Sequence, residues 1–211
     1  MGRYSAPFQF LNNGFWYAQS RGDTLARMNI QSIESSYRAG ESHRLAYTQW
    51  GAPDNPELLF CAHGLSRNGR DFDYLAAAMA ERYHVVCPDY PGRGLSEKLS
   101  RPEDYDNGNY LIDSLNLLRT LGSKTVDWVG TSMGGIIGML LASQEHSPIR
   151  RLVLNDVGSF VPRSALLEIA AYLGYEPRFA TREEACQYFR KTYIGFGPMS
   201  DAQIDHLTEF G

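Results

Sequence analysis

The stretch VDWVGTSMGG, residues 126–135, joins a short apolar run to a serine that stands between glycines, and it decides how the rest of the chain is interpreted. Its first four residues predict a buried strand, and the apolar residues that follow its last glycine predict a helix. Between the two, Gly130, Ser132 and Gly134 form the pattern G-x-S-x-G in the strand, turn and helix context that this pattern requires. The sequence therefore predicts a sharp turn with a serine at its apex.

A turn this sharp strains the backbone of Ser132, and the small residues Gly130 and Gly134 allow neighbouring chain to approach. We expect the hydroxyl to be exposed at the carboxyl end of the sheet, where N–H groups at the start of the next helix favour developing negative charge. Ser132 is therefore predicted to be a nucleophile. The alternative is an ordinary serine in a loop before a helix.

Short apolar runs with the character of buried strands recur along the chain, and helical patterns separate them. The predicted strands cover residues 58–62, 85–87, 126–129 and 152–154, and the predicted helices cover residues 71–82, 110–121 and 134–143. This alternation is typical of βαβ units and predicts an α/β fold with a parallel sheet covered on both faces. Before these units, residues 31–38 and 43–49 alternate in polarity and predict a β-hairpin.

The strand pattern ends near Pro162, and helical patterns follow it. They cover residues 164–173, 181–193 and 200–209, each opened by a Ser or Thr near an N-cap position. We interpret these helices as a lid. The chain is thereby divided into an N-terminal extension (1–30), the N-terminal part of an α/β core (31–161) and a partial helical lid (162–211).

Two more motifs follow predicted strands. His63-Gly64-Leu65 comes directly after residues 58–62, and residues 89–96 read D-x-x-G-x-G-x-S after residues 85–87. Together with G-x-S-x-G, and in this order, they resemble the motifs of the α/β-hydrolase superfamily. The resemblance covers about residues 31 to 211.

The resemblance implies the α/β-hydrolase fold, with a mostly parallel sheet, helices on both faces and a helical lid. It implies that the N–H groups of Leu65 and Met133 form an oxyanion hole and that His63 shapes the loop of the first donor. The segment from Asp89 to Ser96 is expected to be structural; the alternative is that one of its members contacts substrate.

A serine nucleophile needs a base, normally a histidine that a carboxylate holds in place. In most members of the superfamily the acid follows the seventh strand, and in some it follows the sixth. Asp156, after the predicted strand 152–154, is therefore a candidate acid; otherwise it caps or braces the entrance to the lid. The resemblance places the histidine after the eighth strand, so we expect the catalytic histidine to be absent from this chain and the 211 residues alone to be inactive.

The histidines that are present are expected to lie away from Ser132. His43 and His84 start their predicted strands, and we expect them at the edge of the sheet opposite the nucleophile. His146 follows the helix that begins at the serine, and a rise of about 1.5 Å per residue puts it about 18 Å away. His206 lies in the predicted lid and is the alternative base.

Composition limits the partners. Hydrophobic residues make up 43% of the chain and the net charge is −4, with no basic stripe, so nucleic acid is not an expected partner. The first 30 residues carry no apolar core followed by a small-residue cleavage site, and no run approaches the length of a membrane span, so we expect a cytoplasmic protein without a membrane partner. The three cysteines form no C-x-x-C pair, and we expect buried thiols, no metal and no cofactor.

We therefore predict a serine hydrolase that acts on a carboxylic ester or related small acyl substrate through an acyl-enzyme. A serine at position 132 argues against haloalkane dehalogenase and epoxide hydrolase chemistry, which use a carboxylate in this fold. Carbon–carbon bond hydrolases, perhydrolases and a non-catalytic ligand-binding module remain as alternatives. The sequence does not determine the substrate or the oligomeric state.

Overall fold

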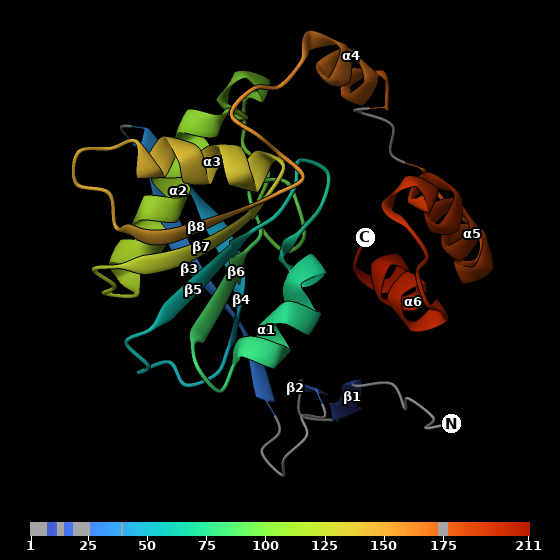
Figure 1. Ribbon diagram of the computed structural model, residues 1–211, viewed down its shortest axis with the longest axis horizontal. Coiled ribbons are helices and arrows are strands. Elements are labelled where there is room, and N and C mark those ends of the chain that lie inside the picture. Colours follow the sequence, from blue (N-terminus) through green and yellow to red (C-terminus); the bar gives the residue numbers. More distant parts are fainter. Residues whose placement is uncertain (1–7, 12–14, 19–25, 39, 173–176) are drawn as a thin grey trace. The chain divides into compact units, whose positions relative to one another are not determined.

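The computed structural model describes residues 8–11, 15–18, 26–38, 40–172 and 177–211 (Figure 1). The chain divides into two compact units, Met1–Ser159 and Phe160–Gly211, and each is described by itself.

The first unit is built on an eight-stranded sheet with the order β1-β2-β3-β4-β6-β5-β7-β8. Its strands are β1 (Phe8–Leu11), β2 (Phe15–Ala18), β3 (Ala26–Arg38), β4 (Glu41–Trp50), β5 (Leu58–Ala62), β6 (His84–Pro88), β7 (Val126–Thr131) and β8 (Ile149–Asn155). Strands β6, β5, β7 and β8 are parallel to one another, whereas β4 pairs antiparallel with β6. The carboxyl ends of four strands therefore meet at one edge of the sheet.

The predicted hairpin is confirmed as β3 and β4, which pair over nearly their whole length. Strand β3 begins at Ala26, so the expected boundary between an extension and the core at residue 30 falls inside a strand. Met28 near the start of β3 is buried whereas Ile30 is 46% exposed, so the alternation of the sequence here does not correspond to one buried face.

Helices cover both faces of the sheet (Figure 1). They are α1 (Asp73–Met79), which follows the short 3-10 helix η1 (Gly69–Phe72), α2 (Asn107–Thr120) and α3 (Met133–Ala142). Neighbouring residues of β5 point to opposite faces, as the pleat requires: Phe60 belongs to the cluster under α2 and α3, and Cys61 to the cluster under α1. Phe60 stacks on Trp128 at 4.4 Å between ring centroids. The continuous apolar runs of the sequence are explained by burial on both faces.

In the described residues of the second unit the helices are α4 (Arg163–Tyr172), α5 (Arg182–Thr192), the short 3-10 helix η3 (Ile194–Phe196) and α6 (Asp201–Phe210). Two of the predicted helix starts are confirmed, because Thr181 and Ser200 each form a capping box with the residue three positions later. Ser164 is not an N-cap residue, since α4 already begins at Arg163. Helices α5 and α6 bury Cys186 and Ile204.

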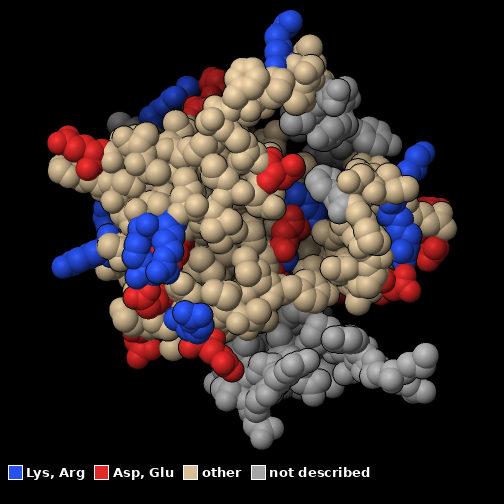
Figure 2. Space-filling view, viewed as in Figure 1, with Lys and Arg blue, Asp and Glu red and all other residues tan. Residues whose placement is uncertain are grey.

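Charged side chains are mixed on the surface. On the face in view in Figure 2, the Lys and Arg side chains that the structure describes lie dispersed among Asp and Glu. Of the helices in the described residues, none combines the length and the apolar composition that a membrane crossing would require.

Candidate active site

Ser132 stands between the end of β7 and the first residue of α3, in a backbone conformation that few residues other than glycine adopt. Its φ is 50° and its ψ is −112°, a strained combination that costs about 1–3 kcal/mol. Hydrogen bonds hold it there. Its N–H donates to the carbonyl of Asn155 at 2.9 Å, and its carbonyl accepts from the N–H groups of Gly135 and Ile136. The predicted sharp turn is therefore present, and the serine is half-buried rather than enclosed.

The two glycines of G-x-S-x-G are required by close backbone contacts. A Cβ on Gly130 would lie 2.3 Å from the carbonyl oxygen of Gly134, and a Cβ on Gly134 would lie 2.1 Å from the carbonyl oxygen of Ala62. Both distances are far below van der Waals contact, and backbone cannot move aside as a flexible side chain can. The motif thus joins β7, α3 and β5 at one crossing point.

The loop after β5 lies directly beside the serine. A Cβ on Gly64 would be 3.8 Å from the Cβ of Ser132. The carbonyl of Gly64 accepts hydrogen bonds from His63 Nδ1 at 2.6 Å and from the N–H of Arg67 at 3.1 Å. In a trans peptide the N–H of the next residue, Leu65, points the opposite way.

Two N–H groups beside Ser132 are available to a ligand. In the part of the chain that the structure describes, neither the Leu65 N–H nor the Met133 N–H donates a hydrogen bond. Met133 is the first residue of α3, where the helix dipole adds positive potential. Such a pair can stabilise negative charge that develops next to the hydroxyl.

His63 is a neutral side chain that shapes the loop. The N–H of Tyr90 donates to its Nε2 at 2.9 Å, so the proton of the ring is on Nδ1 and is donated to the Gly64 carbonyl. The ring is completely buried, and this burial lowers its pKa to about 4. With both nitrogens occupied, His63 cannot act as a base.

Asp89 ties the loop after β6 to the loop after β5. Its buried carboxylate accepts from the N–H of Gly69 and the N–H of Leu95, each at 2.8 Å. Burial raises its pKa, and the two N–H donors act against this shift. Gly94 has a φ of 50°, and a Cβ there would lie 2.2 Å from this carboxylate. The D-x-x-G-x-G-x-S segment is therefore bound into the framework of the site.

Asp156 lies at the same edge of the sheet as Ser132. Thr131 pairs with Asn155, so Asp156 follows β8 where Ser132 follows β7. Its side chain is exposed and its φ is 57°. Among the described residues its carboxylate makes no hydrogen bond or ion pair, and it is not the N-cap of α4, which begins at Arg163. Its role as the acid stays a prediction.

The predicted position of one histidine, His43, is wrong, although that of His84 is correct. His84 opens β6 at the amino end of the parallel strands, as expected, and contacts Gln49. His43 does not lie at that end. Because β4 runs antiparallel to β6, the start of β4 reaches the edge where the parallel strands end, and the carbonyl of Arg44 there accepts from Glu97.

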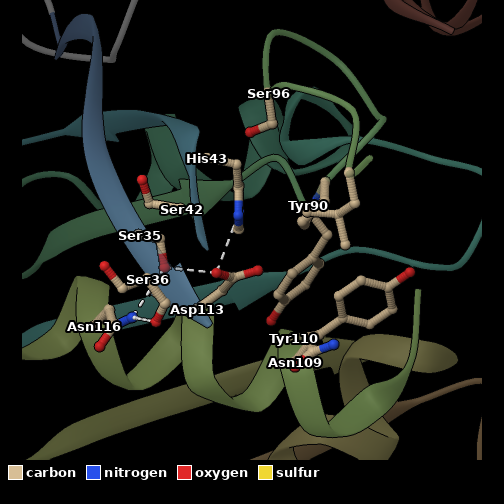
Figure 3. A network of polar contacts seen from close by, with 12 residues as sticks. Ser35, Ser36, Ser42, His43, Tyr90, Ser96, Asn109, Tyr110, Asp113 and Asn116 are labelled. Atoms are coloured by element: carbon tan, nitrogen blue, oxygen red, sulfur yellow. Dashed lines mark hydrogen bonds and ion pairs between the residues drawn. The ribbon is translucent and has the colours of Figure 1, made fainter. Parts of the chain in front are cut away.

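His43 is excluded as a base by burial instead. It belongs to a polar cluster between the hairpin and α2 (Figure 3). Its Nε2 lies 3.2 Å from Asp113 Oδ1, with 3% of the His43 side chain exposed. The same carboxylate oxygen accepts from Ser35 Oγ at 2.6 Å, and Asn116 Nδ2 donates to Ser35 Oγ at 3.0 Å.

Sequence reasoning did not find this cluster. Its members Ser35 and Asp113 are 78 positions apart, which no local pattern reveals. One signal was present on α2, where the buried positions Tyr110, Asp113, Leu117 follow helical spacing and place a carboxylate on the apolar face.

The comparisons with known proteins agree with the fold. A family model described as alpha/beta hydrolase fold matches residues 57–182. The chain is 50% identical over 165 residues to a 3-hydroxybutyrate-oligomer hydrolase from Cupriavidus necator, covering 78% of this chain and 56% of that protein. It therefore spans little more than half the length of this relative.

Two solved structures are also similar. A protein from Rickettsia typhi classed as a hydrolase has a TM-score of 0.80 and 33% identity, over 87% of this chain and 66% of that one. An alpha/beta hydrolase from Novosphingobium aromaticivorans has a TM-score of 0.77 and 31% identity, over 87% of this chain and 63% of that one.

Proposed function

Because the chain belongs to the α/β-hydrolase family, we propose that it carries the nucleophile and oxyanion hole of a serine hydrolase that cleaves carboxylic esters through an acyl-enzyme. One observation carries the proposal. Ser132 is held in a strained turn, half-exposed, between two segments whose N–H groups at Leu65 and Met133 have no partner among the described residues.

Each of these groups has a place in the proposed reaction. Ser132 Oγ attacks the ester carbonyl carbon, and the carbonyl oxygen becomes an oxyanion that accepts from Leu65 N–H and Met133 N–H. The alcohol then leaves with a proton, and water cleaves the acyl-enzyme and returns the proton to Ser132. A base must carry these protons, and Asp156 is our candidate for the carboxylate that orients it.

The proposal assigns no base within the first unit. His63 is buried with both nitrogens bonded, His43 is buried against Asp113, and His84 lies at the opposite end of the strands. His146 lies beyond the end of α3 and is exposed. We propose that the helices of the second unit form a lid, and His206 on α6 is the alternative base within this chain.

The substrate class follows from the relative from Cupriavidus necator. At 50% identity its name supports short oligoesters of 3-hydroxybutyrate as the first substrates to try. Such an oligomer offers an ester carbonyl to Ser132 and a secondary alcohol as the leaving group.

The test uses the complete natural protein. A fluorophosphonate probe should label it, because only an activated serine reacts quickly, and labelling should vanish in Ser132→Ala. Ser143→Ala is the matched control, since Ser143 is an exposed serine at the other end of α3. Hydrolysis of 3-hydroxybutyrate dimer and trimer is then measured. Labelling without ester hydrolysis would favour a carbon–carbon bond hydrolase or a perhydrolase, and no labelling would favour a ligand-binding module.

A further inference from the structure

Arg93 connects the loop after β6 to the loop that carries the first oxyanion donor. Its Nε donates to the carbonyl of Leu65 at 2.8 Å. Its Nη1 donates to the carbonyl of Pro91 at 2.9 Å and to the hydroxyl of Tyr110 at 2.8 Å. Three acceptors on three segments thus share one planar guanidinium, a geometry that the ammonium group of lysine cannot reproduce.

The contact of Arg93 with Leu65 matters because both peptide groups that flank the Leu65 Cα are then fixed by hydrogen bonds. The carbonyl before it, that of Gly64, is held by His63 and by the N–H of Arg67. The carbonyl of Leu65 itself is held by Arg93. Gly64 has no side chain to restrict rotation, so without Arg93 this loop would lose one of the two anchors that fix the direction of the Leu65 N–H.

The other end of Arg93 rests on a rigid support. Tyr110 is 2% exposed in the first turn of α2, and the guanidinium carbon lies 5.2 Å from the centre of its ring. Tyr110 and Tyr90 lie next to each other (Figure 3), and the Tyr90 hydroxyl bonds Ser114 on the next turn of the same helix. Helix α2 therefore supports the oxyanion loop through Arg93.

We propose that Arg93 is a positioning residue for the reaction at Ser132: it fixes the Leu65 segment of the oxyanion loop without touching substrate. The inference rests on the proposed serine hydrolase function. An oxyanion donor is effective only when it is held in place before charge develops. Losing Arg93 should thus affect the chemical step rather than substrate binding.

The experiment compares Arg93→Ala with Arg101→Ala in the complete natural protein. Arg101 is a matched control because it also lies half-exposed before α2 but pairs with Asp104 instead of the oxyanion loop. We expect Arg93→Ala to lower kcat by about 10- to 100-fold, less than the loss of a donor itself, with KM changed by less than about threefold. Millimolar guanidinium ion should restore part of kcat in Arg93→Ala and none in Arg101→Ala.

The outcomes separate the inference from the function it rests on. If Ser132→Ala retains activity, the proposed function fails. The positioning role is wrong, and the function stands, in either of two outcomes with an inactive Ser132→Ala. In the first, Arg93→Ala has the same kcat as Arg101→Ala. In the second, Arg93→Ala raises KM and leaves kcat unchanged. Should Arg93→Ala not fold, Arg93→Lys replaces it. Its affinity for a trifluoromethyl ketone, which forms an oxyanion, must then fall in parallel with kcat, and unchanged affinity would overturn the proposal.

Discussion

Two serines of this protein, Ser35 and Ser132, are built in opposite ways. Ser35 is completely buried, and its hydroxyl donates to Asp113, which also contacts His43. Ser132 is half-exposed in a strained turn, and the N–H groups of Leu65 and Met133 have no hydrogen-bond partner among the described residues. The cluster at Ser35 contains all three residue types of a serine hydrolase, whereas the turn at Ser132 lacks an assigned base.

The difference shows that residue types do not define a catalytic centre. The Ser35 hydroxyl donates a hydrogen bond to a carboxylate rather than to an imidazole, and because it is buried no substrate can reach it. Ser132 is half-exposed instead, and the N–H groups of Leu65 and Met133 are its proposed oxyanion donors. Strain, access and unsatisfied donors are therefore the better indicators of function, because a protein that needed only stability would remove them.

The largest expected effect tests this contrast directly. In the complete natural protein, Ser132→Ala should lower ester hydrolysis by at least about 10³-fold with an unchanged melting temperature, since the nucleophile alone is lost. Ser35→Ala should leave kcat within about twofold and lower the free energy of unfolding by about 1–2 kcal/mol, because Asp113 loses a hydrogen bond. Steady-state kinetics and thermal unfolding measure both. A reversed pattern would place the catalytic serine at position 35.

The second test removes the crossing point that shapes the turn. Gly134→Ala puts a Cβ against the carbonyl of Ala62 and should cost more than about 3 kcal/mol of stability, together with most of the activity. Gly158→Ala is the control, since a Cβ there meets nothing within 4 Å. Chemical denaturation compares the two variants. Equal stabilities would mean that the close approach of α3 to β5 is not required.

The third test breaks the buried cluster. Asp113→Ala should lower the free energy of unfolding by about 3 kcal/mol, because it leaves the Ser35 hydroxyl and His43 without their buried partner. Glu103→Ala, which removes an exposed carboxylate, should change it by less than about 0.5 kcal/mol. Urea unfolding is the measurement. Labelling of Ser132 by the fluorophosphonate should persist in the folded Asp113→Ala protein, and its loss would make the cluster part of the site.

The turn at Ser132 could be predicted because its residues are close together in the sequence, whereas the oxyanion role of the loop after β5 stays a prediction. The spacing of Gly130, Ser132 and Gly134 predicts the sharp turn by itself. His63 follows a strand that five apolar residues make recognisable. The place of His43 could not be predicted, since it depends on whether β4 runs parallel or antiparallel to β6. The role of Arg93 depends on contacts across 28 positions, which only the folded chain brings together.

The fourth test uses pH. The pKa of His63 is lowered to about 4 from an ordinary 6.5, so between these values the unfolded chain binds a proton that the folded chain does not. Stability should therefore fall as the pH drops from about 6.5 to about 4, by up to about 3 kcal/mol from this residue. His63→Gln should remove that part of the slope. Unfolding free energies at several pH values compare the two proteins, and identical slopes would contradict a neutral buried His63.

The smallest expected effect concerns Asp156. If the carboxylate that orients the catalytic base is another residue, Asp156→Asn should change kcat by less than about threefold. The reason is that the exposed Asp156 side chain has no partner among the described residues. A loss as large as that of Ser132→Ala would assign the acid to this position. Circular dichroism confirms that the variant is folded.

The bond between Ser35 and Asp113 also bears on how the protein reaches its fold. It joins positions 78 residues apart, so the chain must close a long loop before the contact can form. Because the Ser35 hydroxyl and the Asp113 carboxylate meet only when β3 and α2 are packed together, we expect this bond to be incomplete in the transition state of folding. We therefore expect that breaking it speeds unfolding more than it slows folding. The cluster then acts chiefly by lengthening the lifetime of the native state.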